Sequence, residues 1–181
     1  MKRSHRIIVV SHCLLNANAK VRPLALYPGV LLDALGSYIE QGVGIVQLPC
    51  PESSYLGVNR WGMSREQYDH PRFRRHCRRI LTPVMDQLEA YRDSGCDIIG
   101  VVGVDGSPNC GIHRIPLGLS GGVVGAMGPI ESQVGDLRSA EGTGVFMEVA
   151  RQMLAERNIG TTFMAVDENH PGKLITKSKG A

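Results

Sequence analysis

The stretch Asp97–Val104, which reads DIIGVVGV, decides the fold class of this 181-residue chain. It is a continuous apolar run rich in β-branched residues, which predicts a strand buried on both faces of a sheet. Runs of the same character occur at residues 7–10, 44–48 and 161–166. Between the runs, apolar residues recur at helical spacing within residues 30–38, 73–91 and 146–154. This alternation predicts an α/β fold, a three-layer Rossmann-like domain with a parallel sheet and helices on both faces.

The length suits one domain, and neither an internal repeat nor an interdomain linker is visible in residues 1–181. The last predicted helix should end at residues 158–160, where a glycine can adopt the left-handed conformation. Residues 111–144 differ from the rest, because they are rich in glycine, contain Pro116 and Pro129 and show weak periodicity. We interpret them as an insertion or a lid near the functional site of a single domain.

Composition and charge narrow the class of protein. The formal net charge is only +3, and the densest basic cluster fits the solvated face of a helix, so nucleic acid is not an expected partner. That cluster comprises Arg72, Arg74, Arg75, Arg78 and Arg79. No run approaches the roughly 20 apolar residues of a membrane span. The first apolar run is too short for a signal peptide, so we expect a cytoplasmic protein.

Three of the five cysteines follow predicted strands. Cys13, Cys50 and Cys110 each follow a predicted parallel strand, so all three should lie at the carboxyl edge of the sheet, where α/β proteins bind ligands. Cys77 lies on the apolar stripe of a helix, and Cys96 precedes a strand at the opposite edge, so both are expected to be structural. An odd count in a reducing compartment does not indicate a disulfide framework. Metal binding or catalysis is therefore the leading role of the three edge cysteines.

The sequences around these cysteines are turns. In Leu48-Pro49-Cys50-Pro51-Glu52, two prolines bracket the sulfur and interrupt backbone pairing. In Asp105–Gly111, DGSPNCG, glycines permit close backbone approach, and such turns supply N–H groups to sulfide or anions. The third turn is Ser11–Asn16, SHCLLN. His12 and His113 flank the sulfurs and are expected at the surface or as support for the ligands.

Three thiolates leave several chemistries open. Thiolate sulfur selects zinc, cuprous copper or iron–sulfur clusters. A closed zinc site would need His12 or His113 as fourth ligand, although zinc ligands usually come in local pairs. A [4Fe–4S] cluster ordinarily takes four cysteines, so with three one iron stays open and can bind a substrate atom as a Lewis acid. A cysteine nucleophile activated by histidine would leave two edge cysteines unexplained.

Taken together, the motifs around Cys13, Cys50-Pro51-Glu52 and Gly106-Ser107-Pro108-Asn109-Cys110-Gly111 resemble the thiouracil desulfidase family. The resemblance implies a [4Fe–4S] cluster on Cys13, Cys50 and Cys110, whose free iron binds the sulfur of a thiocarbonyl substrate while water replaces that sulfur at carbon. It also implies that Glu52 and Ser107 are catalytic and handle the water and the protons. A carboxylate in a partly desolvated site is expected to have a raised pKa and can act as a base for water.

The chain also departs from the usual pattern of that family, at His12, Asn16 and Asn109 and in the stretch that follows Glu52. We expect a different pocket wall, with substrate-binding roles for Asn16 and Asn109, and the further candidates are Tyr55, Arg60 and Trp61. Asp167–His170 follow the last predicted strand and could also face the site, although we expect them to form a polar loop. The expected partner is a small thiolated molecule. The alternative is a non-catalytic iron–sulfur or zinc module that handles sulfide or senses redox state.

Overall fold

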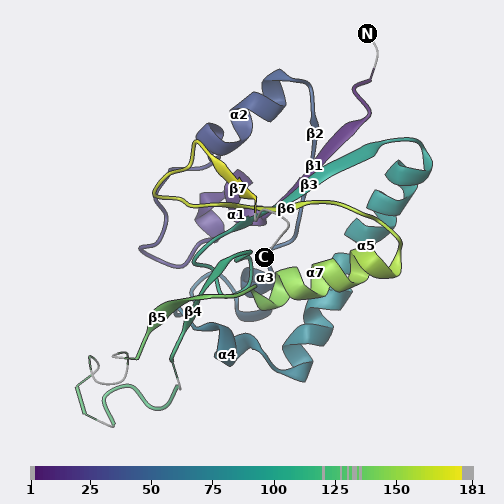
Figure 1. Cartoon of the computed structure of the whole chain (residues 1–181). Coiled ribbons are helices and arrows are strands. Elements are labelled where there is room, and N and C mark those ends of the chain that lie inside the picture. The colour runs from purple at the N-terminus through teal and green to yellow at the C-terminus, as the bar shows by residue number, and fades with distance from the viewer. Residues whose placement is uncertain are drawn as a thin grey trace.

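The computed structural model of the chain describes residues 3–119, 121–126, 128, 129, 131, 134 and 136–176. The predicted α/β fold is confirmed: a five-stranded sheet has helices on both faces (Figure 1). The strand order is β2-β1-β3-β6-β7. The strands are β1 (Arg6–Val10), β2 (Gly44–Gln47), β3 (Asp97–Val104), β6 (Phe163–Val166) and β7 (Leu174–Thr176). All four predicted strands are present.

Strand direction is what positions the site. β1 pairs in parallel with both β2 and β3, and β3 pairs in parallel with β6. The short edge strand β7 is antiparallel to β6 and had no counterpart in the predicted set, so the sheet is mixed rather than wholly parallel. The carboxyl ends of the four parallel strands therefore share one edge of the sheet.

Side chains of one strand alternate between two cores. Ile7 and Val9 of β1 pack with α5 (Pro71–Asp93) and α7 (Val145–Glu156) on one face. Ile8 and Val10 pack with α2 (Leu32–Glu40) on the other face. Figure 1 shows α2 and the α5–α7 pair on opposite sides of the sheet. This double burial explains why the central strands are continuous apolar runs rather than alternating ones.

The C-terminal end of α7 corrects one expectation. The left-handed residue after the helix is Asn158, with φ 56°, whereas Gly160 has no positive φ. Asparagine tolerates this conformation better than most residues. The helix itself ends at Glu156.

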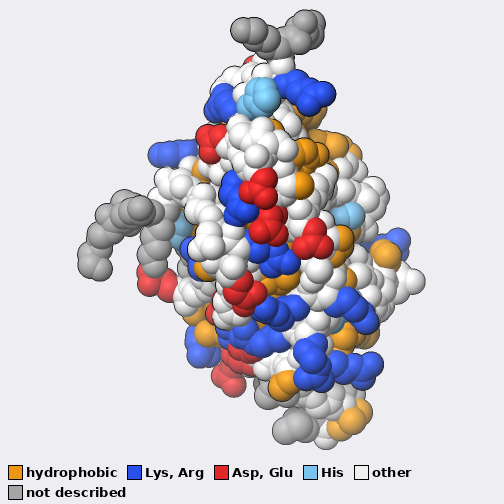
Figure 2. Space-filling view, turned by 90° about the vertical axis from the view of Figure 1, so that its right-hand side faces the viewer, with side chains coloured by type: hydrophobic (Ala, Val, Ile, Leu, Met, Phe, Trp, Pro, Cys, Tyr) orange, Lys and Arg blue, Asp and Glu red, His pale blue; other side chains and the backbone are white. Residues whose placement is uncertain are grey.

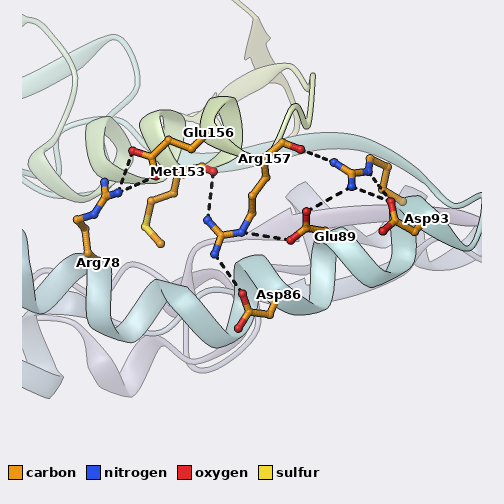
Figure 3. A network of polar contacts seen from close by, with 8 residues as sticks. Arg78, Asp86, Glu89, Asp93, Met153, Glu156 and Arg157 are labelled. Atoms are coloured by element: carbon orange, nitrogen blue, oxygen red, sulfur yellow. Dashed lines mark hydrogen bonds and ion pairs between the residues drawn. The ribbon is translucent and has the colours of Figure 1, made fainter.

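The arginine-rich stretch lies on α5 as predicted, and several of its side chains are paired rather than only solvated. Arg78 Nη2 lies 2.6 Å from Glu156 Oε2 of α7, and Arg157 pairs with Asp86 and Glu89 of α5 (Figure 3). On the molecular face in Figure 2, acidic side chains are interspersed with the basic ones. These half-exposed pairs contribute little stability individually and mainly align the two helices.

The remaining elements lie near the carboxyl edge of the sheet. They are α1 (His12–Leu15), a 3₁₀ turn (Ala17–Ala19), α3 (Pro51–Leu56), α4 (Arg65–Tyr68), β4 (Arg114–Leu117) and β5 (Arg138–Glu141). β4 and β5 form a separate antiparallel ribbon inside the segment interpreted as an insertion or lid (Figure 1). Residues 120, 127, 130, 132, 133 and 135 of that segment lie outside the described part, and closure of a lid stays a prediction. No helix in the described ranges is long and apolar enough to cross a membrane.

Candidate functional site

The structure brings the three edge cysteines into one pocket. Cys13 lies in α1 directly after β1, Cys50 is the N-cap of α3 after β2, and Cys110 lies in the turn after β3. All three line a pocket of about 540 Å³, together with Glu52 and Ser107. Cys77 is buried on the core side of α5, and Cys96 lies before β3 at the opposite end of the strand, as expected. The convergence depends on the shared strand direction and not on local spacing.

The local structure around Cys50 is a helix start. Pro51 is the first residue of α3, where its missing N–H costs no hydrogen bond. The N–H of Ser53 donates to the Cys50 sulfur over 3.4 Å. The predicted proline-bracketed turn therefore continues at once into a helix, and the sulfur takes the place of a capping oxygen.

The turn that carries Cys110 is fixed by Asp105 and Ser107. Asp105 Oδ1 accepts hydrogen bonds from the backbone N–H groups of residues 112–114, at 2.9 to 3.2 Å. Ser107 Oγ accepts from the N–H of Asn109 and of Cys110, the latter at 2.9 Å. A Cβ on Gly103 would lie 2.3 Å from the carbonyl oxygen of Cys110, so the turn packs directly on β3. The Cys110 sulfur is thus held in place, and the Ser107 hydroxyl keeps its proton available for donation.

Burial governs the protonation of two of the thiols. Burial raises the pKa of Cys13 to about 12, and the nearby Lys20 ammonium offsets part of this shift while Glu168 adds to it. Burial likewise raises the pKa of Cys110 well above its ordinary value, and the charges of Cys13, Cys50 and Glu52 add to the effect. The three cysteines and Glu52 therefore act on one another through their charges. Thiolates at this position need a cationic centre to balance their negative charge.

Neither flanking histidine hydrogen-bonds an edge cysteine. His12 lines the pocket, and burial lowers its pKa. His113 instead contacts Asp105, with Nδ1 3.2 Å from Oδ2. Within the described ranges no hydrogen bond joins a histidine to Cys13, Cys50 or Cys110. A cysteine nucleophile needs a lowered thiol pKa and a neighbouring base, so these features do not favour one.

Glu52 is held on both carboxylate oxygens. Arg60 Nε lies 2.9 Å from Glu52 Oε2, and Asn109 Nδ2 donates to Glu52 Oε1 over 3.1 Å. The side chains of Arg60 and Glu52 are only 4% and 12% exposed. Arg60 also donates to the carbonyl oxygen of Ala19 over 2.7 Å, which ties α3 to the turn after α1. The sequence indicated Glu52 but gave no sign of this buried ion pair.

Tyr68 lies next to this pair. Burial raises the pKa of the Tyr68 phenol, and the Glu52 charge raises it further. Its hydroxyl is therefore protonated at neutral pH and able to donate.

A second ion pair faces the pocket from another part of the chain. Lys20 Nζ lies 2.6 Å from Glu168 Oε2, and both residues line the pocket. Of the two interpretations of residues 167–170, the polar loop is right for His170, whose side chain is 84% exposed. Asp167, Glu168 and Asn169 instead line the pocket, as their position after a parallel strand at the same edge as the cysteines had allowed.

The expected pocket wall is only partly present. Arg60 lines the pocket, whereas Asn16, Tyr55, Trp61 and Asn109 are not among its lining residues. The Asn16 side chain accepts from the N–H of Asn18, Tyr55 packs against Phe73, and Trp61 is 80% exposed. Asn109 is fully buried, and its side-chain amide contacts Glu52 of the site rather than the pocket.

The outer wall of the pocket is apolar. It comes from the loop after Lys20, from the loop before α4 and from the ribbon segment, three parts of the chain that are separate in sequence. Its members are Val21, Leu24, Leu26, Met63, Pro116, Leu119, Val134 and Leu137. Residues of the 111–144 segment thus reach the site, as the insertion hypothesis expected.

Removing Arg60 should destabilise the protein strongly. Arg60→Ala leaves the Glu52 carboxylate buried without its partner, and we expect a loss of about 3–5 kcal/mol in the free energy of unfolding. Arg78→Ala breaks the half-exposed pair with Glu156 and should cost less than about 1 kcal/mol. Urea denaturation of both variants checks this, and equal losses would contradict the buried-pair account.

The raised thiol pKa values predict a pH dependence of stability. A thiol whose pKa is raised by folding stabilises the native state below the unfolded pKa of about 8.5, and this contribution is lost as the pH rises towards 12. Metal-free protein should therefore lose stability between pH 8.5 and 10.5. Cys13→Ala should reduce that slope by up to about 1.4 kcal/mol per pH unit in urea denaturation. Identical slopes would show that Cys13 does not carry the effect.

Comparison with known proteins yields one relative to report. No family model matches the chain, and no solved structure matches it. It is 34% identical over 112 residues to the uncharacterized protein MJ0003 of Methanocaldococcus jannaschii, a match that covers 62% of this chain and 71% of that protein. The chain therefore belongs to the same family as this archaeal protein.

Proposed function

We propose that this protein is an iron–sulfur-dependent desulfidase that removes sulfur from a thiocarbonyl compound. The observation that carries the proposal is the convergence of three cysteine thiols and a carboxylate, Glu52, in one pocket at the carboxyl edge of the sheet. The resemblance of the three motifs to thiouracil desulfidases supports the same reaction. A thiouracil-like molecule is the substrate class that this resemblance suggests.

The residues present fit a cluster of the [4Fe–4S] type. Burial raises the pKa of Cys13 and of Cys110, so their thiolates need the positive charge that iron would supply. The Ser53 N–H points at the Cys50 sulfur, and hydrogen bonds to sulfur are a usual feature of cluster sites. No fourth cysteine lines the described pocket. Bound there, the cluster would supply an open iron as a Lewis acid for the departing sulfur.

The protein side chains would carry the proton chemistry. Overall, R₂C=S and H₂O give R₂C=O and H₂S, with no net oxidation. Glu52 is placed to take a proton from the attacking water, because Arg60 and Asn109 fix the direction of its carboxylate. The Ser107 hydroxyl, whose oxygen already accepts two backbone bonds, is placed to donate to the substrate or the water. The pocket wall of apolar side chains would limit the access of bulk water to the reacting carbon.

Anaerobic reconstitution tests the ligand set. The protein should bind about four irons and four sulfides per chain, and single changes of Cys13, Cys50 or Cys110 to Ala should abolish this. Cys96→Ala, which removes a cysteine at the other end of β3, should leave the iron content unchanged. Iron and sulfide analysis with absorption spectra gives the readout. A colourless protein after reconstitution, or zinc retained at the same cysteines, would favour a non-catalytic metal module instead.

Replacing Glu52 tests catalysis separately from cluster binding. Glu52→Gln keeps the shape but removes the base, and we expect sulfide release from 2-thiouracil to fall about 10²–10⁴-fold at unchanged iron content. Glu40→Gln, on the exposed end of α2, is the matched control and should have full activity. Sulfide release that does not change in Glu52→Gln would remove Glu52 from the reaction and support the alternative module.

A further inference from the structure

The Lys20–Glu168 pair lies at the same pocket as the cysteines but has no part in the reaction proposed above. Glu168 follows β6, whose end is tied to the Cys110 turn by a 3.0 Å bond from the N–H of Asp105 to the carbonyl oxygen of Val166. Lys20 follows the 3₁₀ turn after α1. The charges of both residues act on the Cys13 thiol, so the pair lies within electrostatic reach of that sulfur. A molecule that binds at the cysteines therefore lies next to this pair.

Glu168 has one oxygen in use and one free. Oε2 contacts Lys20 Nζ at 2.6 Å, whereas Oε1 is buried and has no hydrogen-bond partner. The Tyr27 hydroxyl lies close to Glu168, but its single proton is donated to the carbonyl oxygen of Cys13, over 3.0 Å. A buried acceptor without a donor is unfavourable, and a ligand that brings a donor relieves it.

The other carboxylates along the described pocket lining are already engaged. Glu52 contacts Arg60 and Asn109. Asp105 accepts from three backbone N–H groups and contacts His113, and Asp167 contacts Asn169 and His170. Among the carboxylates of this described lining, Glu168 is therefore the one with a buried oxygen that lacks a donor.

The charge of the pair defines the donor. Lys20 neutralises Glu168, so the site does not demand a cationic ligand. A neutral N–H group is the donor that suits a charge-compensated carboxylate oxygen. A cyclic thioamide or thiourea carries such an N–H directly beside its thiocarbonyl carbon.

We propose that Glu168, oriented by Lys20, is a specificity-determining residue that accepts a hydrogen bond from a ring N–H of the substrate. The inference rests on the proposed desulfidase function and narrows its substrates to cyclic thioamides and thioureas with a free N–H. Thiocarbonyl compounds that are alkylated at this nitrogen are poor substrates. The hydrogen bond binds and orients, and no proton is transferred to Glu168.

The experiment compares substrate methylation with residue replacement. Reconstituted wild-type protein is given 2-thiouracil and its 1-methyl and 3-methyl derivatives, and kcat/KM should fall at least about 10-fold on methylation of the contacted nitrogen. Glu168→Leu should lower kcat/KM for 2-thiouracil by a similar factor and lose the discrimination between the two compounds. Iron content must equal that of the wild type, which shows that the cluster site is intact.

Two further variants control for side effects. Glu168→Gln keeps the shape, but Lys20 would hold its amide oxygen and turn the amide NH₂ towards the substrate N–H, so discrimination should again be lost. This variant serves as the test if Glu168→Leu does not fold. Glu40→Gln should retain the full discrimination of the wild type.

A binding measurement separates this inference from the proposed reaction. Calorimetric titration of the reconstituted protein with uracil and its 1-methyl and 3-methyl forms should show the same preference, and Glu168→Leu should lose it. No turnover of any thiocarbonyl compound would contradict the proposed function, and the binding titration would then decide the role of Glu168. Equal binding or equal kcat/KM of free and methylated forms in the wild type, or discrimination that persists in Glu168→Leu, would overturn the inference.

Discussion

Parallel pairing of β1 with β2 and β3 is the constraint on which the site depends. The pairing shifts register once, against β3 between Ile7 and Ile8, and then continues to the last residue of β1, where Val10 faces Gln47 on one side and Val102 on the other. It continues one step further through the bond from the Ser11 N–H to the Val102 carbonyl oxygen. Because the three strands run in one direction, the chain leaves all of them at the same edge. Cys13, Cys50 and Cys110 therefore meet at one edge although they are far apart in the sequence.

Paired charges hold together the loops that form the pocket at that edge of the sheet. The pocket contains two buried ion pairs, Glu52–Arg60 and Lys20–Glu168, on different segments. Buried charges are stable only with partners, so each pair ties a loop to another part of the fold. The thiols have no comparable partner, and burial raises the pKa of Cys13 and Cys110. The carboxylates of the two ion pairs thus have their counter-charge within the protein, whereas the thiols suit a cationic cofactor.

The carboxylates of the two ion pairs suit different roles in the proposed reaction. Glu52 has both oxygens engaged and a fixed direction, which suits a base that must address one water molecule. Glu168 has an oxygen free, which suits recognition of a ligand. The apolar outer wall, contributed by the loop after Lys20, the loop before α4 and the β4–β5 segment, suits a small and largely uncharged molecule.

Local patterns in the chain were enough for the fold class, the four parallel strands, the main helices and the gathering of three cysteines. Buried parallel strands need continuous apolar runs, and their carboxyl ends share an edge. The residues that pair with Glu52 and Glu168 could not be predicted from local sequence patterns. Lys20 and Glu168 are 148 positions apart, and Glu52 and Asn109 are 57 apart. Such pairs follow from loop paths and side-chain directions, which periodicity does not encode. For the same reason Asn109 is buried and Tyr55 packs half-buried against the core, so neither lies in the pocket wall. Only the tertiary structure decided which polar side chains face the cysteines.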